Sequence, residues 1–318
     1  MVLERVKCLA DYWQGNVRHL RHWPHLAVHL CSSVFICGFL AFSFITSSTA
    51  APISLQDDLG RKVELKQPAQ RIVALAPFLT EIAFAVGAGE RVVGASAYSD
   101  YPPEATKLPA VSSAAGFDVE RIAALAPDLA LVWRDSMRAG DVELLERMGV
   151  AVFVANARRL EDVPRLLRIV GKLAGRDASA IVQSFERELR QVRAEFSGRR
   201  RLTAFLEIWN RPLTTIAGRH FMNEALEACG AVNVFADLEG VAPVVEWEEV
   251  YARDPEVVVG VASAAGEEEF RANWRARATL AAVKNDRLVF VDADALQRPT
   301  PRTPQAIRGL CGRLDRLR

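Results

Sequence analysis

The chain of 318 residues has few of the side chains from which metal sites and nucleophilic catalysts are built. Only five histidines occur, and all but His220 lie within the first 30 residues, as His19, His22, His25 and His29. One remaining imidazole cannot form a histidine cluster for zinc or manganese, or a mixed Cys/His site. The sequence therefore predicts no metal site beyond residue 30.

Motifs of common catalytic and nucleotide-binding sites are also missing. Residues 94–98 (GASAY) lack the final glycine of the Gly-x-Ser-x-Gly turn that exposes a catalytic serine. The glycines of residues 86–91 (VGAGER) do not form a dinucleotide-binding fingerprint, and no P-loop occurs. We therefore predict that the chain is not an enzyme and that it needs no cofactor.

The first 50 residues differ in composition from the remainder. Basic residues between Arg5 and Arg21 precede an uncharged stretch from Leu26 to Thr46, and the small residues 47–50 follow it. This order predicts a secretory signal peptide over residues 1–50, cleaved after Ala50. An uncleaved membrane anchor is the alternative, because the uncharged stretch is about long enough to span a bilayer. A lipoprotein is less favoured, since no cysteine follows a small residue there.

Removal of this leader leaves a nearly neutral chain with two cysteines. Four of the 40 basic and two of the 39 acidic residues lie in the leader, so residues 51–318 carry a net charge of about −1. This balance gives no electrostatic reason to expect nucleic acid as a partner. Cys229 and Cys311 would form one disulfide in an oxidising compartment, or remain two buried free thiols. On the chain-entropy model a bridge across about 80 residues would stabilise the fold by on the order of 4 kcal/mol.

One pattern occurs twice, at positions 118–133 (DVERIAALAPDLALVW) and 246–261 (EWEEVYARDPEVVVGV). In each copy an acid is followed two positions later by a glutamate, and a proline and an acid then precede an apolar run. Carboxylates favour the positive end of a helix, proline ends a helix, and the apolar run is typical of a buried strand. The repeat predicts two similar lobes with a ligand cleft between them.

Apolar strands alternate with helical segments in both halves, which predicts parallel sheets covered by helices. We predict a hairpin over residues 51–70, an N-terminal lobe over 71–160, connecting helices over 161–200 and a C-terminal lobe over 201–318. The connector has apolar residues at helical spacing and is not a flexible Gly/Ser tether. The expected fold class is α/β, with two Rossmann-like lobes joined by a long helical connector that limits their relative motion.

Ligands of open parallel sheets bind beyond the carboxyl ends of the strands, and these ends are rich in aromatic residues and proline here. Pro77, Tyr98 and Trp133 follow predicted strands of the first lobe, and Trp209 and residues 294–298 follow strands of the second. Flat aromatic surface suits a large planar or apolar ligand. The alternative for Trp133 and Trp209 is that they pack under loops. The alternative for His220 is a position at the surface or at a helix cap.

Glu120 and Glu248 lie in the first turn of matching predicted helices. The helix dipole stabilises a carboxylate there by roughly a few tenths of a kcal/mol, which alone would explain either residue. Their equivalent positions also suit a partner that contacts both lobes and offers basic residues to pair with them.

Taken together, these residues resemble the helical-backbone periplasmic binding proteins of bacterial ABC importers, a family whose members bind cobalamin, ferric siderophores or haem. The similarity extends from residue 71 to the C-terminus, and it is strongest to the cobalamin binders. Its most specific segments are Pro77 to Ala85, Tyr98 to Pro103, Val119 to Ile122, Trp133-Arg134, Leu226 to Gly230 and Pro301-Arg302.

The resemblance implies an exported, monomeric protein of the periplasm that holds a corrinoid between its lobes. Cobalamin or cobinamide would be the ligand, and the permease and ATPase of an importer would be the partners. Glu120 and Glu248 would dock on arginines of the permease, and Cys229 and Cys311 would be bridged. The expected ligand contacts are Pro77, Tyr98, Trp133, Trp209, Asp294, Ala295, Leu296, Gln297 and Arg298.

The chain departs from the enterobacterial-type binders at Ala114, Ala242 and Ala295, where those proteins carry tryptophans. The loss of aromatic surface predicts a wider cleft or a different ligand, and Trp209 and Trp247 are candidates to replace it.

Haem and a ferric siderophore are the alternatives to a corrinoid as ligand, and an enzyme or sensor is the alternative to a binding protein. Haem would use Tyr98 or His220 as an axial ligand, and a ferric siderophore would favour a cluster drawn from Arg134, Arg211 and Arg298. The most remote alternative is an enzyme or sensor on the same scaffold.

Overall fold

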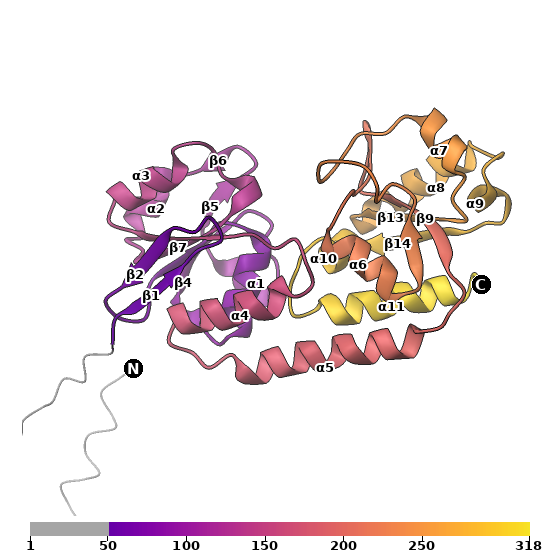
Figure 1. Ribbon diagram of the computed structural model, residues 1–318. Helices are drawn as coiled ribbons and strands as arrows, with labels where there is room; N and C mark the ends of the chain where they lie inside the picture. Colours follow the sequence, from indigo (N-terminus) through magenta and orange to yellow (C-terminus); the bar gives the residue numbers. More distant parts are fainter. Residues whose placement is uncertain (1–50) are drawn as a thin grey trace, which may run out of the picture. The chain divides into compact units, whose positions relative to one another are not determined.

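The computed structural model describes residues 51–318, so the predicted signal peptide lies outside the described residues. Two α/β lobes lie side by side above a long helix, α5 (Ser179–Phe196), in Figure 1. The predicted α/β fold class is confirmed. No helix in residues 51–318 has the length and apolar character needed to cross a membrane.

The N-terminal lobe is built on a six-stranded sheet in the order β6-β5-β4-β3-β7-β8. All of its pairings are parallel except the one between β5 and β6. Its central strands are almost entirely buried, which explains their unbroken apolar runs. Its elements are β3 (Ile72–Ala74), α1 (Pro77–Ala85), β4 (Val92–Ser96), β5 (Ala110–Ser113), β6 (Gly116–Phe117), α2 (Val119–Ala124), β7 (Leu129–Trp133), α3 (Asp141–Arg147) and β8 (Ala151–Ala155).

The C-terminal lobe has a four-stranded parallel sheet in the order β12-β9-β13-β14. A short hairpin, β10 (Trp209–Asn210) and β11 (Leu213–Thr214), projects from the end of β9. The other elements are β9 (Leu202–Glu207), α6 (Phe221–Ala228), β12 (Ala231–Asn233), α7 (Trp247–Arg253), β13 (Val257–Ala262), α8 (Glu267–Arg275), α9 (Ala281–Lys284), β14 (Leu288–Asp292), α10 (Ala293–Leu296) and α11 (Thr303–Asp315).

Strands β4-β3-β7-β8 of the N-terminal sheet have the same order as the four strands of the C-terminal sheet, which accounts for the repeat in the sequence. In each lobe the first strand of the sheet, β3 or β9, lies between the next strand, β4 or β12, and the strand that ends the repeated pattern, β7 or β13. The two copies of the sequence pattern form equivalent units, α2 followed by β7 and α7 followed by β13. Both helices begin at the acid that starts the pattern: Asp118 caps α2, and Glu246 forms a capping box with Glu249 at the start of α7.

Helices α4 (Asp162–Leu173) and α5 follow the N-terminal lobe. Helix α4 packs against α1 within that lobe, whereas α5 contacts α4 at one end and α6 and α11 of the other lobe. Its buried face consists of Val182, Phe185, Leu189, Val192 and Phe196, spaced three or four residues apart. A hairpin of β1 (Ile53–Gln56) and β2 (Lys62–Leu65) packs beside β8.

Cys229 and Cys311 form a disulfide, as predicted. The bridge joins the end of α6 to the middle of α11 across 82 positions, and both residues are fully buried. It ties the last helix of the chain to the lobe that contains it.

Candidate ligand-binding cleft

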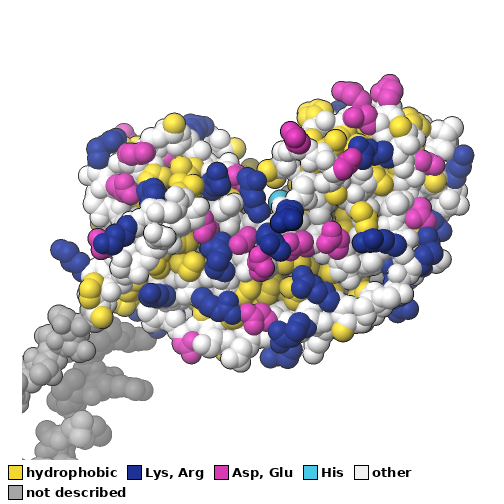
Figure 2. Space-filling view, in the orientation of Figure 1, with side chains coloured by type: hydrophobic (Ala, Val, Ile, Leu, Met, Phe, Trp, Pro, Cys, Tyr) yellow, Lys and Arg dark blue, Asp and Glu magenta, His cyan; other side chains and the backbone are white. Residues whose placement is uncertain are grey.

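A cavity of about 600 Å³ opens at the carboxyl ends of the strands of both sheets, between the two lobes. Figure 2 shows the notch between the lobes, with Lys and Arg side chains beside it. The volume lies in the range of about 300–1,000 Å³ that is usual for small-molecule sites. The wall is mainly apolar and consists of Pro77, Phe78, Trp133, Asp135, Ala157, Arg158, Ile208, Trp209, Ile216, His220, Phe221, Met222, Val241, Ala242, Gln297, Arg298 and Pro299.

The N-terminal lobe contributes an aromatic corner to this cavity. Pro77 occupies the first turn of α1, where the missing N–H costs no helical hydrogen bond. The rings of Phe78 and Trp133 meet edge to face, with 6.0 Å between their centroids and 89° between their planes. This contact fixes the indole at the end of β7, so that its remaining surface faces the cavity.

The opposite wall comes from the C-terminal lobe. Trp209 stands on the β10–β11 hairpin and is 65% exposed, although its indole N–H donates to the carbonyl oxygen of Arg211 at 3.0 Å. Ile208, Ile216 and Met222 add apolar surface to the same cavity. An aromatic ring that is oriented by a hydrogen bond and still open to solvent is available to stack on a ligand.

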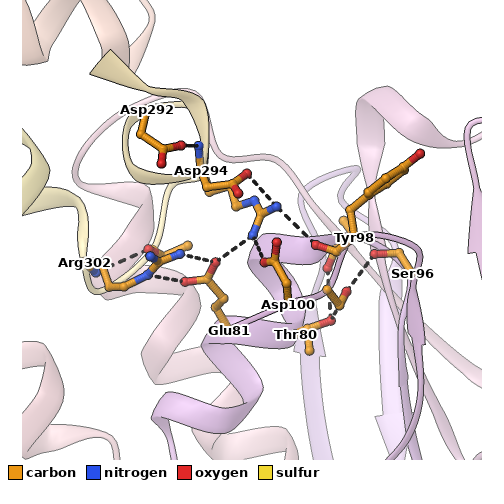
Figure 3. A network of polar contacts seen from close by, with 12 residues as sticks. Thr80, Glu81, Ser96, Tyr98, Asp100, Asp292, Asp294 and Arg302 are labelled. Atoms are coloured by element: carbon orange, nitrogen blue, oxygen red, sulfur yellow. Dashed lines mark hydrogen bonds and ion pairs between the residues drawn. The ribbon is translucent and has the colours of Figure 1, made fainter. Parts of the chain in front are cut away.

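A network of ion pairs crosses from one lobe to the other beside the cavity (Figure 3). The carboxylate of Glu81, on α1, accepts two hydrogen bonds from Arg302 at 2.7 and 2.9 Å and one from Arg298 at 3.4 Å. Arg298 also pairs with Asp100 at 2.6 Å and with Asp294 at 2.7 Å. Its side chain is only 13% exposed, so this guanidinium holds the two lobes together more than it faces a ligand.

Burial and ion pairing act in opposite directions on the two aspartates of this network. Burial opposes ionisation of Asp100, but the hydrogen bond and charge of Arg298 outweigh it and lower the pKa of Asp100. Burial, together with the neighbouring charges of Asp100 and Asp292, raises the pKa of Asp294 despite its contact with Arg298. Asp294 is therefore the more easily protonated of the two carboxylates.

Tyr98 lies at the edge of the cleft and is not part of the cavity wall. Its side chain is 81% exposed and its ring points away from the ion-pair network in Figure 3, while its carbonyl oxygen accepts from Arg298 at 3.1 Å. Its φ of 65° places it in the left-handed region. Buried hydroxyls beneath the loop hold this conformation, because Ser99 contacts both Thr80 and Ser96 at 3.0 Å.

The predicted contacts at residues 294–298 divide between cavity and core. Gln297 and Arg298 line the cavity, whereas Asp294 and Ala295 do not. Leu296 is fully buried in the core of the lobe and does not reach the cavity. The reason is the single turn of α10, which turns Leu296 inward while Gln297 follows the helix and donates to the carbonyl oxygen of Val261 at 3.0 Å.

Trp247, proposed to replace the missing aromatic surface, packs in a different place. It is half-buried against Trp274 in the core beneath α7, with the guanidinium of Arg277 3.6 Å above its ring. Of the three arginines considered for a siderophore, only Arg298 lines the cavity. Phe78, Arg158 and Met222 also line the cavity and were not predicted, although each lies within a few residues of a strand end or a helix start.

Glu120 and Glu248 are exposed in the first turns of α2 and α7. The two helices lie in different lobes, on the side of the molecule away from α5 (Figure 1).

A buried carboxyl group of the C-terminal lobe predicts an unusual dependence of stability on pH. Glu207, at the end of β9, is 6% exposed and accepts a hydrogen bond from the indole N–H of Trp274. Burial raises its pKa from 4.5 to about 7. Between about pH 4.5 and 7, Glu207 is therefore protonated in the folded protein and ionised in the unfolded chain. Its contribution to stability is complete below pH 4.5 and is lost as the pH rises through 7.

Replacing Glu207 with glutamine is expected to raise the free energy of unfolding at pH 8 by about 2–3 kcal/mol, with little change near pH 4.5. The amide retains an acceptor for Trp274 and carries no charge to bury. Urea unfolding of variant and parent at both pH values measures the difference. Burial lowers the pKa of His220 to about 4, so His220 makes the free energy of unfolding rise with pH. This contribution is the same in variant and parent and cancels in their difference. An equal gain at both pH values would contradict the raised pKa.

Two matching lobes around an aromatic cavity define a two-lobed binding protein. Residues 72–295 match the periplasmic binding protein family, and the chain belongs to that family.

Named relatives narrow the comparison. The vitamin B12-binding protein of Vibrio parahaemolyticus is 32% identical over 254 residues, which cover 79% of this chain and 92% of that protein. The solved vitamin B12-binding protein of Vibrio cholerae is 31% identical with a TM-score of 0.71, covering 79% of this chain and 98% of that one. A periplasmic haem-binding protein solved with two haems has a TM-score of 0.70 at 23% identity over 78% of this chain and 98% of its own, which shows a shared fold.

Proposed function

We propose that this protein captures a corrinoid in the cleft between its lobes and delivers it to an ABC importer. It acts in the periplasm after cleavage of its signal peptide, as a monomer, and it performs no covalent step on its ligand. The partners are the permease and ATPase of the importer in the inner membrane.

The single observation that carries this proposal is the apolar, aromatic cavity at the carboxyl ends of both sheets, in a chain related to vitamin B12-binding proteins. Trp133 and Trp209 approach it from opposite lobes, so a flat ring system would be contacted on both sides. Binding then comes from stacking and apolar burial. The ion pairs of Arg298 between the lobes support a cleft that is largely formed before the ligand arrives.

Haem and ferric siderophores remain the competing ligands, and the geometry favours neither. The arginines considered for a siderophore do not gather in the wall of the cavity. Tyr98, a candidate axial ligand for haem, has its side chain outside that wall.

Titration of the tryptophan fluorescence of residues 51–318 with cobalamin, cobinamide, haem and a ferric siderophore tests the proposal. Saturable quenching by the two corrinoids is expected, because Trp133 and Trp209 line the cavity. Replacing both of these tryptophans with phenylalanine should remove most of the quenching and weaken binding. The matched control is Trp247→Phe, which should leave affinity unchanged because the half-buried ring of Trp247 packs against the core of the C-terminal lobe and does not line the cavity. Quenching by the iron ligands alone would exclude the corrinoid.

A further inference from the structure

Three polar side chains from both lobes meet in the wall of the cavity. Asp135 follows β7, Arg158 follows β8, and His220 precedes α6 of the opposite lobe. Arg158 donates to both carboxylate oxygens of Asp135, at 3.2 and 3.4 Å. The remainder of the wall is mainly apolar, and the side chains of Arg158 and Asp135 are 36% and 35% exposed there.

His220 presents a hydrogen-bond donor to the cavity. Its Nδ1 accepts the backbone N–H of Met222 at 3.3 Å, capping α6. Burial and the nearby charge of Arg158 lower the pKa of His220 to about 4, so the ring is neutral at the pH of the periplasm. A neutral imidazole that accepts at Nδ1 carries its proton on Nε2. Nε2 is therefore a donor and not the lone pair that an axial metal ligand must offer.

Arg158 has donor capacity left over. Its Nη2 donates to Asp135, but its Nε is enclosed without a hydrogen-bond partner among the described residues. The Arg158 side chain is 36% exposed as a whole, but an enclosed N–H without an acceptor is unfavourable, and a small rotation of the side chain would offer it to an acceptor in the cavity.

The three groups together offer two donors and one acceptor with no net charge. The cation of Arg158 is balanced by Asp135, and His220 is neutral. A primary carboxamide has the matching set, since its carbonyl oxygen accepts and its amino group donates. A carboxylate in the same place would meet the carboxylate of Asp135 and be repelled.

We propose that Asp135, Arg158 and His220 form a subsite for a peripheral carboxamide of the ligand. The carbonyl oxygen of the amide faces His220 and Arg158, and its amino group faces Asp135. This inference rests on the proposed function, because corrinoids carry such amides around their ring whereas haem carries carboxylates.

The test compares the binding of cobinamide with that of its monocarboxylic acids, in which one side-chain amide is hydrolysed. The parent protein should bind cobinamide at least about tenfold more tightly than one of the acids, the one whose carboxylate falls in the subsite. Asp135→Asn should narrow or reverse this preference, because it removes the repulsion and leaves Arg158 unpaired. Asp286→Asn removes the same charge at an exposed site away from the cavity and should change nothing.

A second variant separates binding from folding. His220→Asn retains a good helix cap but shortens the donor, so the thermal midpoint should persist while the affinity for cobinamide falls about 3- to 10-fold. Equal affinity for the amide and every acid, or no effect of His220→Asn, would overturn the carboxamide subsite while the corrinoid itself still bound. A parent protein that bound no corrinoid at all would instead refute the proposed function.

Discussion

Replacing Glu81 with alanine is expected to lower the free energy of unfolding by about 3–5 kcal/mol. The carboxylate of Glu81 is 2% exposed and compensates Arg302 and Arg298, whose side chains are only 29% and 13% exposed. Without it, Arg302 loses its ion pair and lies next to a second cation, Arg298, which keeps its pairs with Asp100 and Asp294. Urea unfolding of residues 51–318, followed by circular dichroism, measures the loss.

The matched control is Glu143→Ala on α3, which removes one exposed glutamate from a helix and should change stability by less than about 0.5 kcal/mol. A second comparison isolates the charge, because Glu81→Gln preserves the shape of the side chain and should still be strongly destabilising. A loss below about 1 kcal/mol for both Glu81 variants would mean that water takes the place of the carboxylate and that the network is not a structural tie.

The alternation of strands and helices was predictable because it depends on local patterns, one of which occurs twice. An acid at a helix start, a proline at its end and a following apolar run identify α2–β7 and α7–β13 from sequence alone. Strand β12 was not predicted, since Ala231–Asn233 is three residues long and too short to show a period. The turn α10 was missed for the same reason, and Leu296 was therefore expected at the ligand and not in the core.

The walls of the cleft were only partly predictable. Residues directly after strands, such as Trp133 and Trp209, could be identified because the carboxyl ends of parallel strands meet at one edge of a sheet. The contact of Glu81 with Arg298 joins positions 217 apart and depends on how the two lobes face each other. No local pattern contains that information. Trp247 shows the same limit, because adjacency to a strand does not tell whether a ring enters the cleft or the core beneath α7.

Replacing both Glu120 and Glu248 with alanine is expected to abolish corrinoid uptake by cells while leaving the affinity of the isolated protein within about twofold of the parent. Both carboxylates are exposed, and neither belongs to the wall of the cavity. They stand in the first turns of equivalent helices in the two lobes, so a partner that covers the mouth of the cleft could meet one on each side. Uptake of radiolabelled cobalamin is measured in a strain in which this chain is the sole corrinoid-binding protein.

Each single replacement should reduce uptake less than the double one, because one of the two proposed contacts with the importer would remain. The matched control combines Glu143→Ala with Glu268→Ala, which removes one exposed helical carboxylate from each lobe at other positions and should leave uptake intact. Charge reversal by Glu120→Lys with Glu248→Lys should prevent uptake as completely as alanine does, since the basic surface proposed for the importer would then face like charge. Normal uptake by the double alanine variant, or a parallel loss of corrinoid affinity, would show that the two glutamates serve their own helices or the ligand and not a docking surface.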